Sequence, residues 1–190
     1  MKASSKRYYW LMALLASAIA LNALWIPLKA YYAQWLIEQS WSHSLATGEK
    51  KAPWPWADHY ALVKFTFPSL NTSTIALMGA DPSSLAFAPG VMHEYANTTQ
   101  TGALVVAAHN DTHFSFLPDL AIGDRFMMIN NKGREYTYVV DQVSIIDTTE
   151  KSLALSKHDN RLLLVTCYPF SSSIENTTQR LIISALPLTT

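Results

Sequence analysis

The feature that most constrains this chain is an uncharged, largely apolar segment from Tyr8 to Leu28. About 20 apolar residues span the hydrocarbon core of a bilayer, so the segment predicts one transmembrane helix. Lys2, Lys6 and Arg7 precede it, and a basic flank of this kind stays in the cytoplasm. We therefore expect residues 1–29 to be a basic tip and signal anchor in the inner (cytoplasmic) membrane. The rest of the chain would lie on the periplasmic or extracytoplasmic side.

A cleaved signal peptide is the alternative for this segment, because Ala16, Ala18 and Ala20 offer small-residue cleavage sites. The apolar stretch continues past them through Leu24 to Ile26, which favours a retained helix.

Charge and cysteine content limit the partners and the covalent cross-links that the chain can have. The 190 residues include 14 basic and 14 acidic ones, so no global field would attract nucleic acid, and we expect no such partner. The single cysteine excludes an internal disulfide and leaves a thiol that serves either packing or chemistry. Once the terminal segment is set aside, the length suits one domain.

The region after the apolar segment has two parts. Apolar and aromatic residues recur at three- to four-residue spacing from Tyr31 to Leu45, which predicts an amphipathic helix ended by Gly48. Two prolines and two tryptophans in residues 53–56 then predict a linker that docks on an apolar surface or the membrane interface. We expect residues 30–58 to form this helix and linker, and residues 59–190 to form the folded domain.

Beyond Asp58 the apolar pattern changes to alternation. Residues 63–67, 126–129 and 136–140 show the two-residue period of strands. The turn sequence Asn131-Lys132-Gly133 separates the last two, which predicts a hairpin.

Three further runs are continuously apolar or nearly so, as expected of strands buried on both faces. They cover residues 103–108, 162–165 and 181–184. Together with the alternating strands, they predict an all-β barrel or sandwich with short helical turns.

Two chemically active residues lie at the ends of these runs. Cys167 ends one apolar strand, and Pro169 stops that strand because proline lacks a backbone donor. Arg180 begins the next apolar run after a loop rich in serine, asparagine and threonine. If the two strands pair antiparallel, Cys167 and Arg180 come together.

His109 ends a third apolar strand, so all three residues lie at strand ends. A thiol with an ordinary pKa of about 8.5 must become a thiolate to attack a carbonyl, and an imidazole near 6.5 can take and return the proton. An arginine can stabilise the thiolate and then an oxyanion. The combination of Cys167, His109 and Arg180 therefore indicates acyl-transfer chemistry.

Each of these residues also has a structural explanation. A free cysteine often packs as a small hydrophobe, a strand-end histidine is often a satisfied polar residue, and an arginine at a strand start is often a surface charge. The residues alone leave both interpretations open.

The motifs around them resemble those of the sortase family. Thr166-Cys167-Tyr168-Pro169-Phe170 is similar to the family's cysteine motif, and residues 109–114 resemble its histidine motif. Arg180 stands where the family's arginine follows the cysteine. Residues 85–90 and 53–58 are most similar to the sortases of Gram-negative bacteria, class GN. Asn110 replaces a frequent arginine, and Ala108 replaces a frequent glycine.

This resemblance implies an eight-stranded β-barrel with short helices. It also implies a protein substrate with a C-terminal LPxTG-like sorting signal and a thioacyl intermediate on Cys167 that an amine acceptor resolves. No cofactor or metal is implied. The catalytic residues would be His109, Cys167 and Arg180, and the neighbours expected to bind substrate are Thr112, Thr166 and Tyr168.

Three alternatives belong to other classes. His109 and His113 have H-x-x-x-H spacing and could bind a metal with Cys167, but no glutamate lies between them and His109 follows a strand. A non-catalytic, membrane-tethered binding module would make Cys167 buried and inert. A hydrolytic cysteine peptidase of the envelope shares the thioacyl chemistry and differs in the nucleophile that resolves it.

Overall fold

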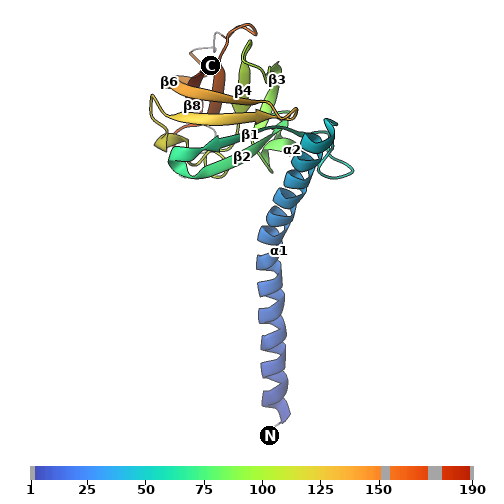
Figure 1. Cartoon of the computed structure of the whole chain (residues 1–190). Coiled ribbons are helices and arrows are strands. Elements are labelled where there is room, and N and C mark those ends of the chain that lie inside the picture. The colour runs from blue at the N-terminus through green and yellow to red at the C-terminus, as the bar shows by residue number, and fades with distance from the viewer. Residues whose placement is uncertain (1–2, 151–154, 171–176, 189–190) are drawn as a thin grey trace. The chain divides into compact units, whose positions relative to one another are not determined.

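Eight β-strands close into a barrel in the computed structural model of the chain, which describes residues 3–150, 155–170 and 177–188 (Figure 1). This confirms the predicted all-β class and decides for the barrel over the sandwich. Around the barrel the strands neighbour one another in the order β1-β2-β3-β4-β7-β8-β6-β5. Their bounds are β1 Ala61–Phe67, β2 Thr72–Met78, β3 Gly90–Ala96, β4 Leu104–Ala107, β5 Arg125–Asn130, β6 Glu135–Asp147, β7 Leu162–Cys167 and β8 Gln179–Pro187.

Most neighbouring strands pair antiparallel, but β2 with β3 and β4 with β7 pair parallel. Short helices lie in the connections: α2, Pro82–Leu85, and 3-10 turns at Pro68–Leu70 and Leu117–Asp119. The parallel pairing of β4 and β7 brings together two segments far apart in the sequence, so that the ends of these strands lie side by side.

The predicted hairpin joins β5 and β6, which pair antiparallel. Gly133 adopts a positive φ of 73°, and its N–H donates to the Asn130 carbonyl. The Asn130 side chain accepts hydrogen bonds from the N–H groups of Lys132 and Arg134, each at 3.0 Å. The turn sequence therefore predicts this connection correctly.

The interior of the barrel is filled by aromatic and aliphatic side chains. Phe126 packs against Phe67 and Tyr138, with ring centroids 5.0 and 5.7 Å apart. Full burial of each such side chain contributes about 1.5–3 kcal/mol. The inward-facing residues of β4, β7 and β8 belong to the same core: Leu104, Val106, Leu162, Leu164, Leu181, Ile183 and Ala185.

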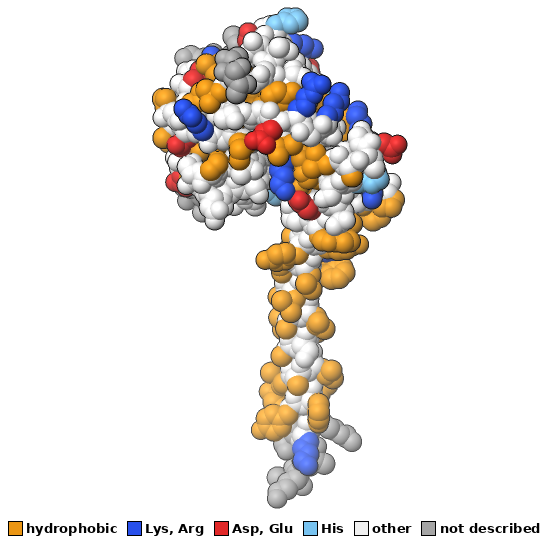
Figure 2. All heavy atoms as spheres, viewed as in Figure 1, with side chains coloured by type: hydrophobic (Ala, Val, Ile, Leu, Met, Phe, Trp, Pro, Cys, Tyr) orange, Lys and Arg blue, Asp and Glu red, His pale blue; other side chains and the backbone are white. Residues whose placement is uncertain are grey.

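The predicted membrane segment lies within a long helix, α1, Ala3–Thr47. Its side chains from Tyr8 to Leu28 are exposed, and Figure 2 shows hydrophobic side chains along its visible face. By length and composition this helix could cross a membrane, which suits both the anchor and the signal-sequence alternative. The amphipathic helix expected from Tyr31 is continuous with the apolar segment. It ends before Gly48, as predicted, where φ is 74°.

The compact unit that contains the barrel begins at Ile37, earlier than the predicted domain start at residue 59. Ile37 and Trp41 lie four residues apart on one face of α1 and are almost fully buried. They form a second apolar cluster with barrel residues. Lys64 of β1 also pairs with Glu38, at 3.0 Å. The last turns of α1 therefore belong to the folded unit.

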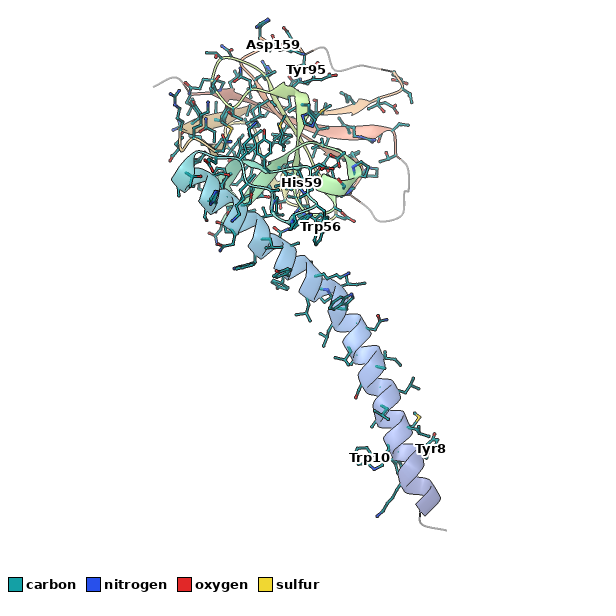
Figure 3. All side chains as sticks on the ribbon, turned by 90° about the vertical axis from the view of Figure 1, so that its right-hand side faces the viewer. Tyr8, Trp10, Trp56, His59, Tyr95 and Asp159 are labelled. Carbon is teal, nitrogen blue, oxygen red and sulfur yellow. The ribbon has the colours of Figure 1, made fainter. Side chains whose placement is uncertain are left out.

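The proline and tryptophan linker docks through Trp54, while Trp56 is exposed. The Trp54 ring makes edge contacts with His59 at 5.4 Å and Phe87 at 4.9 Å. Figure 3 labels Trp56 and His59 near one end of the barrel and Tyr95 near the other. The linker thus docks against His59 and against Phe87, two residues after the end of α2.

His59 is buried, and its Nε2 has no hydrogen-bond partner within the described residues. Burial lowers its pKa below the ordinary 6.5, against the opposing effect of Asp81 and Asp58. The unfolded chain therefore takes up this proton at higher pH than the folded chain, so stability falls as pH drops below about 6.5. We expect His59→Phe to reduce this pH-dependent loss of unfolding free energy by at most about 1.4 kcal/mol per pH unit.

Urea unfolding of the detergent-solubilised chain at pH 7.5 and 5.5 measures the effect. His158→Gln, which removes an exposed histidine, is the control. A His59→Phe variant that loses as much stability as the parent between the two pH values would contradict the expectation.

Candidate active site

Cys167 and Arg180 lie directly opposite each other on β7 and β8, which pair antiparallel as predicted. Residues opposite each other across such a pair share a face and have Cβ atoms about 5 Å apart. Thr166, the preceding residue, is buried inside the barrel, so alternation along β7 places Cys167 on the outer face. Cys167 is half-buried there, which leaves part of its surface accessible.

His109 reaches the same place from β4. In the parallel pairing of β4 with β7, Ala107 is the register partner of Val165. The N–H of Ala108 donates to the Val165 carbonyl at 3.2 Å, so the two segments stay hydrogen-bonded for one residue beyond β4. Continuing this register by one residue sets His109 beside Cys167. Cys167 and Arg180 thus lie opposite each other on β7 and β8, and His109 lies two residues beyond the end of β4, the neighbour of β7 on its other side.

Thr166 joins the ends of β4 and β7 from the inside. Its hydroxyl donates to the Ala108 carbonyl at 2.7 Å, and the residue is 2% exposed. The residues before the histidine and before the cysteine are therefore bonded to each other. This geometry fits a structural role for Thr166 better than the predicted substrate contact.

The guanidinium of Arg180 is held by backbone carbonyls at the start of β8. Its Nη1 donates to the carbonyls of Thr177 at 2.6 Å and Gln179 at 2.8 Å. Within the described ranges, Nε and Nη2 of Arg180 have no hydrogen-bond partner. Asp147, at the end of β6, has a pKa lowered by hydrogen bonds from Thr149 and Thr178 and by Arg180.

His113 lies in the loop after His109 and shares its surroundings. Burial, together with the charge that His109 can carry, lowers the pKa of His113, while Asp111 acts in the opposite direction. Phe114, which follows, is fully buried, and its N–H donates to the His109 carbonyl at 3.0 Å. The loop is thus folded back on His109, and His113 is expected to stay neutral at neutral pH.

An apolar cluster lies next to Cys167 on the outer face of β4, β7 and β8. We call it the outer cluster. Its buried members are Val105, Leu163 and Ile182, and the partly buried ones are Tyr95, Ile146, Leu155 and Val165. Val165 precedes Cys167 by two residues on β7, so both side chains project from the same face. The continuous apolar runs of these strands are explained by this cluster on one side and the core on the other.

The outer cluster is bounded by the chain that connects β6 to β7. The Tyr95 hydroxyl on β3 donates to the Leu155 carbonyl at 3.3 Å. Beyond Leu155, the Asp159 side chain accepts from the Ser156 N–H at 2.8 Å, and Figure 3 labels Tyr95 and Asp159 at the same end of the barrel. Tyr95 is not among the residues predicted from the sequence, because no local pattern links β3 to this connection.

The other two predicted substrate-binding residues lie at the surface or partly so. Thr112 is exposed in the loop after His109, and its carbonyl accepts hydrogen bonds from Ser115. Tyr168 is half-buried, and its carbonyl accepts a hydrogen bond from the Thr177 hydroxyl. Residues 171–176 of the predicted loop lie outside the described residues.

The alternative of a metal site gains no support from the geometry. In the part of the chain that the structure describes, no three side chains of the His, Cys, Asp and Glu types group as a metal ion would require. His109 and His113 also lie on a loop rather than on one face of a helix.

Replacing Thr166 by valine tests the link between β4 and β7. Thr166→Val leaves the buried Ala108 carbonyl without this donor, and we expect a loss of about 1–2 kcal/mol in unfolding free energy. Thr66→Val makes the same chemical change at a half-buried strand position and should cost less than about 0.5 kcal/mol. Urea unfolding compares the two variants. Equal losses would mean that the Thr166 hydroxyl does not stabilise the strand ends.

Comparison with known proteins gives this geometry a context. The family model described as a sortase domain matches residues 65–188. The chain is 30% identical to Sortase D of Bacillus subtilis (strain 168) over 105 residues, which are 55% of this chain and 52% of that protein. The chain thus spans about half the length of this relative.

Solved structures share the fold. Sortase A from Corynebacterium diphtheriae superimposes with a TM-score of 0.59 at 22% identity, over 71% of this chain and 64% of that one. Sortase C from Clostridium perfringens SM101 superimposes with a TM-score of 0.58 at 18% identity, over 85% and 90% of the two chains. At these identities the likeness concerns the barrel alone.

Proposed function

Because the chain belongs to the sortase family, we propose that it is a cysteine transpeptidase with Cys167 as nucleophile, His109 as proton carrier and Arg180 as oxyanion donor. The observation that carries this proposal is that β7 lies between β4 and β8, with Cys167 opposite Arg180 and with His109 in the segment that directly follows β4. The cysteine is partly accessible, which a catalytic thiol requires and a packing cysteine does not.

In the proposed reaction the Cys167 thiolate attacks a substrate carbonyl, and the new S–C bond produces a tetrahedral oxyanion. Arg180 donates to that oxygen through Nε or Nη2, while its Nη1 stays on the backbone carbonyls. The C–N bond of the substrate then breaks, and His109 gives its proton to the leaving amine. An incoming amine attacks the thioester, passes its proton to His109 and releases Cys167.

For the substrate we propose a protein whose C-terminal LPxTG-like sorting signal lies along the outer cluster. An extended peptide that places its carbonyl at Cys167 would run beside half-buried Val165, whose exposed apolar surface suits an apolar side chain of the signal. Exposed Thr112 lies in the loop after His109, half-buried Tyr168 directly follows Cys167, and both would contact the residues around the cleaved bond.

Two finer proposals come from the sequence. The similarity of residues 53–58 and 85–90 to the sortases of Gram-negative bacteria supports membership of that subclass. The two segments contact each other through the rings of Trp54 and Phe87. The apolar helix and its basic flank support single-pass anchoring in the inner membrane, with the barrel on the periplasmic side.

A reporter fused after Thr190 tests the orientation. We expect alkaline phosphatase, which is active only after export, to be active at this position, and a reporter that fluoresces only in the cytoplasm to be dark. The opposite pattern would contradict the localisation. It would also remove the encounter with exported substrates.

The activity itself is tested by incubating the detergent-solubilised chain with a panel of sorting peptides, with and without an amine such as triglycine. Mass spectrometry reads the products. We expect cleavage within the sorting signal of a productive peptide and ligation of the acyl part to the amine. Cleavage that yields only the free acid at saturating amine would favour the hydrolytic peptidase. Absence of both products across the panel would contradict the proposed function.

A further inference from the structure

Asn110 connects the loop that carries His109 to the loop that follows Cys167. Its side-chain Nδ2 donates to the Pro169 carbonyl at 3.0 Å, between residues 59 positions apart. Asn110 directly follows the histidine, and Pro169 lies two residues after the cysteine. The hydrogen bond therefore spans the site at the level of the two proposed reactive groups.

This hydrogen bond holds a segment that the strand pairing does not hold. Before His109, Ala108 is tied to β7 through both its N–H and its carbonyl. The regular pairing of β4 with β7 ends at Ala107 and Val165, before His109. Pro169 has no N–H of its own to continue a ladder, but its carbonyl still requires a donor. Within the described residues, the Asn110 amide is the link from this loop to the chain after Cys167.

We propose that Asn110 is a positioning residue that sets the distance between the His109 imidazole and the Cys167 thiol. The inference rests on the proposed function. With Ala108 fixed on one side and Asn110 on the other, the backbone of His109 is held at both ends against the segment that carries Cys167. Proton transfer requires a heavy-atom separation of about 2.6–3.2 Å, and a displacement of about 1 Å can cost a hundredfold in rate.

The bond also explains why an amide suits this position. A neutral donor on a short side chain reaches the carbonyl of the neighbouring loop, whereas an aspartate of the same shape has no proton to donate. Asn110 thus fixes a loop in which His109 and Thr112 are exposed.

The test uses the detergent-solubilised full chain with Asn110→Ala, Asn110→Asp and Asn110→Gln. We expect alanine and aspartate to lower kcat about 10- to 100-fold with KM within about twofold of the parent, because the loss concerns geometry and not binding. Glutamine keeps the donor on a longer side chain and should recover at least about threefold over alanine. Asn160→Asp makes the aspartate change at an exposed site near the opposite end of β7 and should keep the parent rate.

A second measurement requires no peptide. The rate at which iodoacetamide alkylates Cys167, followed from pH 5 to 9, reports how the imidazole and thiol influence each other. We expect the profile of Asn110→Ala to shift towards that of His109→Ala, with the urea midpoint of unfolding unchanged. A parent-like alkylation profile in Asn110→Ala overturns the proposal, as does a kcat within about twofold of the parent. An inactive parent with a shifted Asn110→Ala profile contradicts the proposed function but supports the positioning role.

Discussion

Cys167→Ala is expected to reduce peptide cleavage and ligation to background without unfolding the barrel. The thiol is the proposed attacking group, and loss of the nucleophile in an acyl-transfer enzyme costs on the order of a millionfold in kcat. The side chain is half-buried at a strand end and faces away from the main core, so alanine leaves no large cavity. Product formation with a sorting peptide and amine, measured by mass spectrometry, gives the rate.

Stability and activity must be measured on the same preparation of this variant. The expected pair of results is a rate at background and an unfolding free energy within about 1 kcal/mol of the parent. Retained turnover would exclude Cys167 as the nucleophile. An unfolded Cys167→Ala chain would instead favour the structural interpretation of the cysteine that the sequence leaves open.

Arg180→Lys is expected to lower kcat about a hundredfold to a thousandfold although the positive charge is kept. The structure gives a specific reason. Nη1 of Arg180 donates to the carbonyls of Thr177 and Gln179, which fixes the plane of the guanidinium and leaves its other donors to reach the oxyanion. A lysine has one ammonium, so it cannot hold both carbonyls and also reach a substrate oxygen beside Cys167.

Steady-state kinetics with the productive peptide measure this defect, and Arg125→Lys at an exposed position of β5 is the matched control. The parent, the control and Arg180→Lys should unfold at the same urea concentration. Activity of Arg180→Lys within about threefold of the parent would correspond to less than about 1 kcal/mol of transition-state stabilisation. Arg180 would then act as a nearby charge that favours the thiolate.

The strands that carry the site could be predicted because they are buried on both faces. Runs such as 162–165 are continuously apolar since one side faces the core and the other the outer cluster. The pairing of Cys167 with Arg180 also follows from the sequence, because the two strands are consecutive and antiparallel neighbours need only a short loop. β2 and β3 are missed: polar residues such as Thr72 and Glu94 interrupt their pattern, and their pairing is set by distant partners.

The contacts between segments far apart in the sequence are the part that could not be predicted. The segments that carry His109 and Cys167 come together because β4 and β7 pair in parallel at a separation of 58 residues, and no local pattern fixes that register. The hydrogen bonds from Asn110 to Pro169 and from Tyr95 to Leu155 depend on the same arrangement. The last turns of α1 join the folded unit through Ile37 and Trp41, whose helical spacing is equally compatible with a free amphipathic helix.

The most direct test of the proposed chemistry is the intact mass of the protein during turnover. A productive sorting peptide without an added amine should leave a fraction of the chain heavier by the acyl part of the peptide. Proteolysis should place this adduct on the fragment that contains Cys167, and hydroxylamine should remove it because thioesters react with that nucleophile. Cleavage of the peptide with no such adduct in rapid-quench samples, or an adduct on any other residue, would contradict a thioacyl intermediate on Cys167.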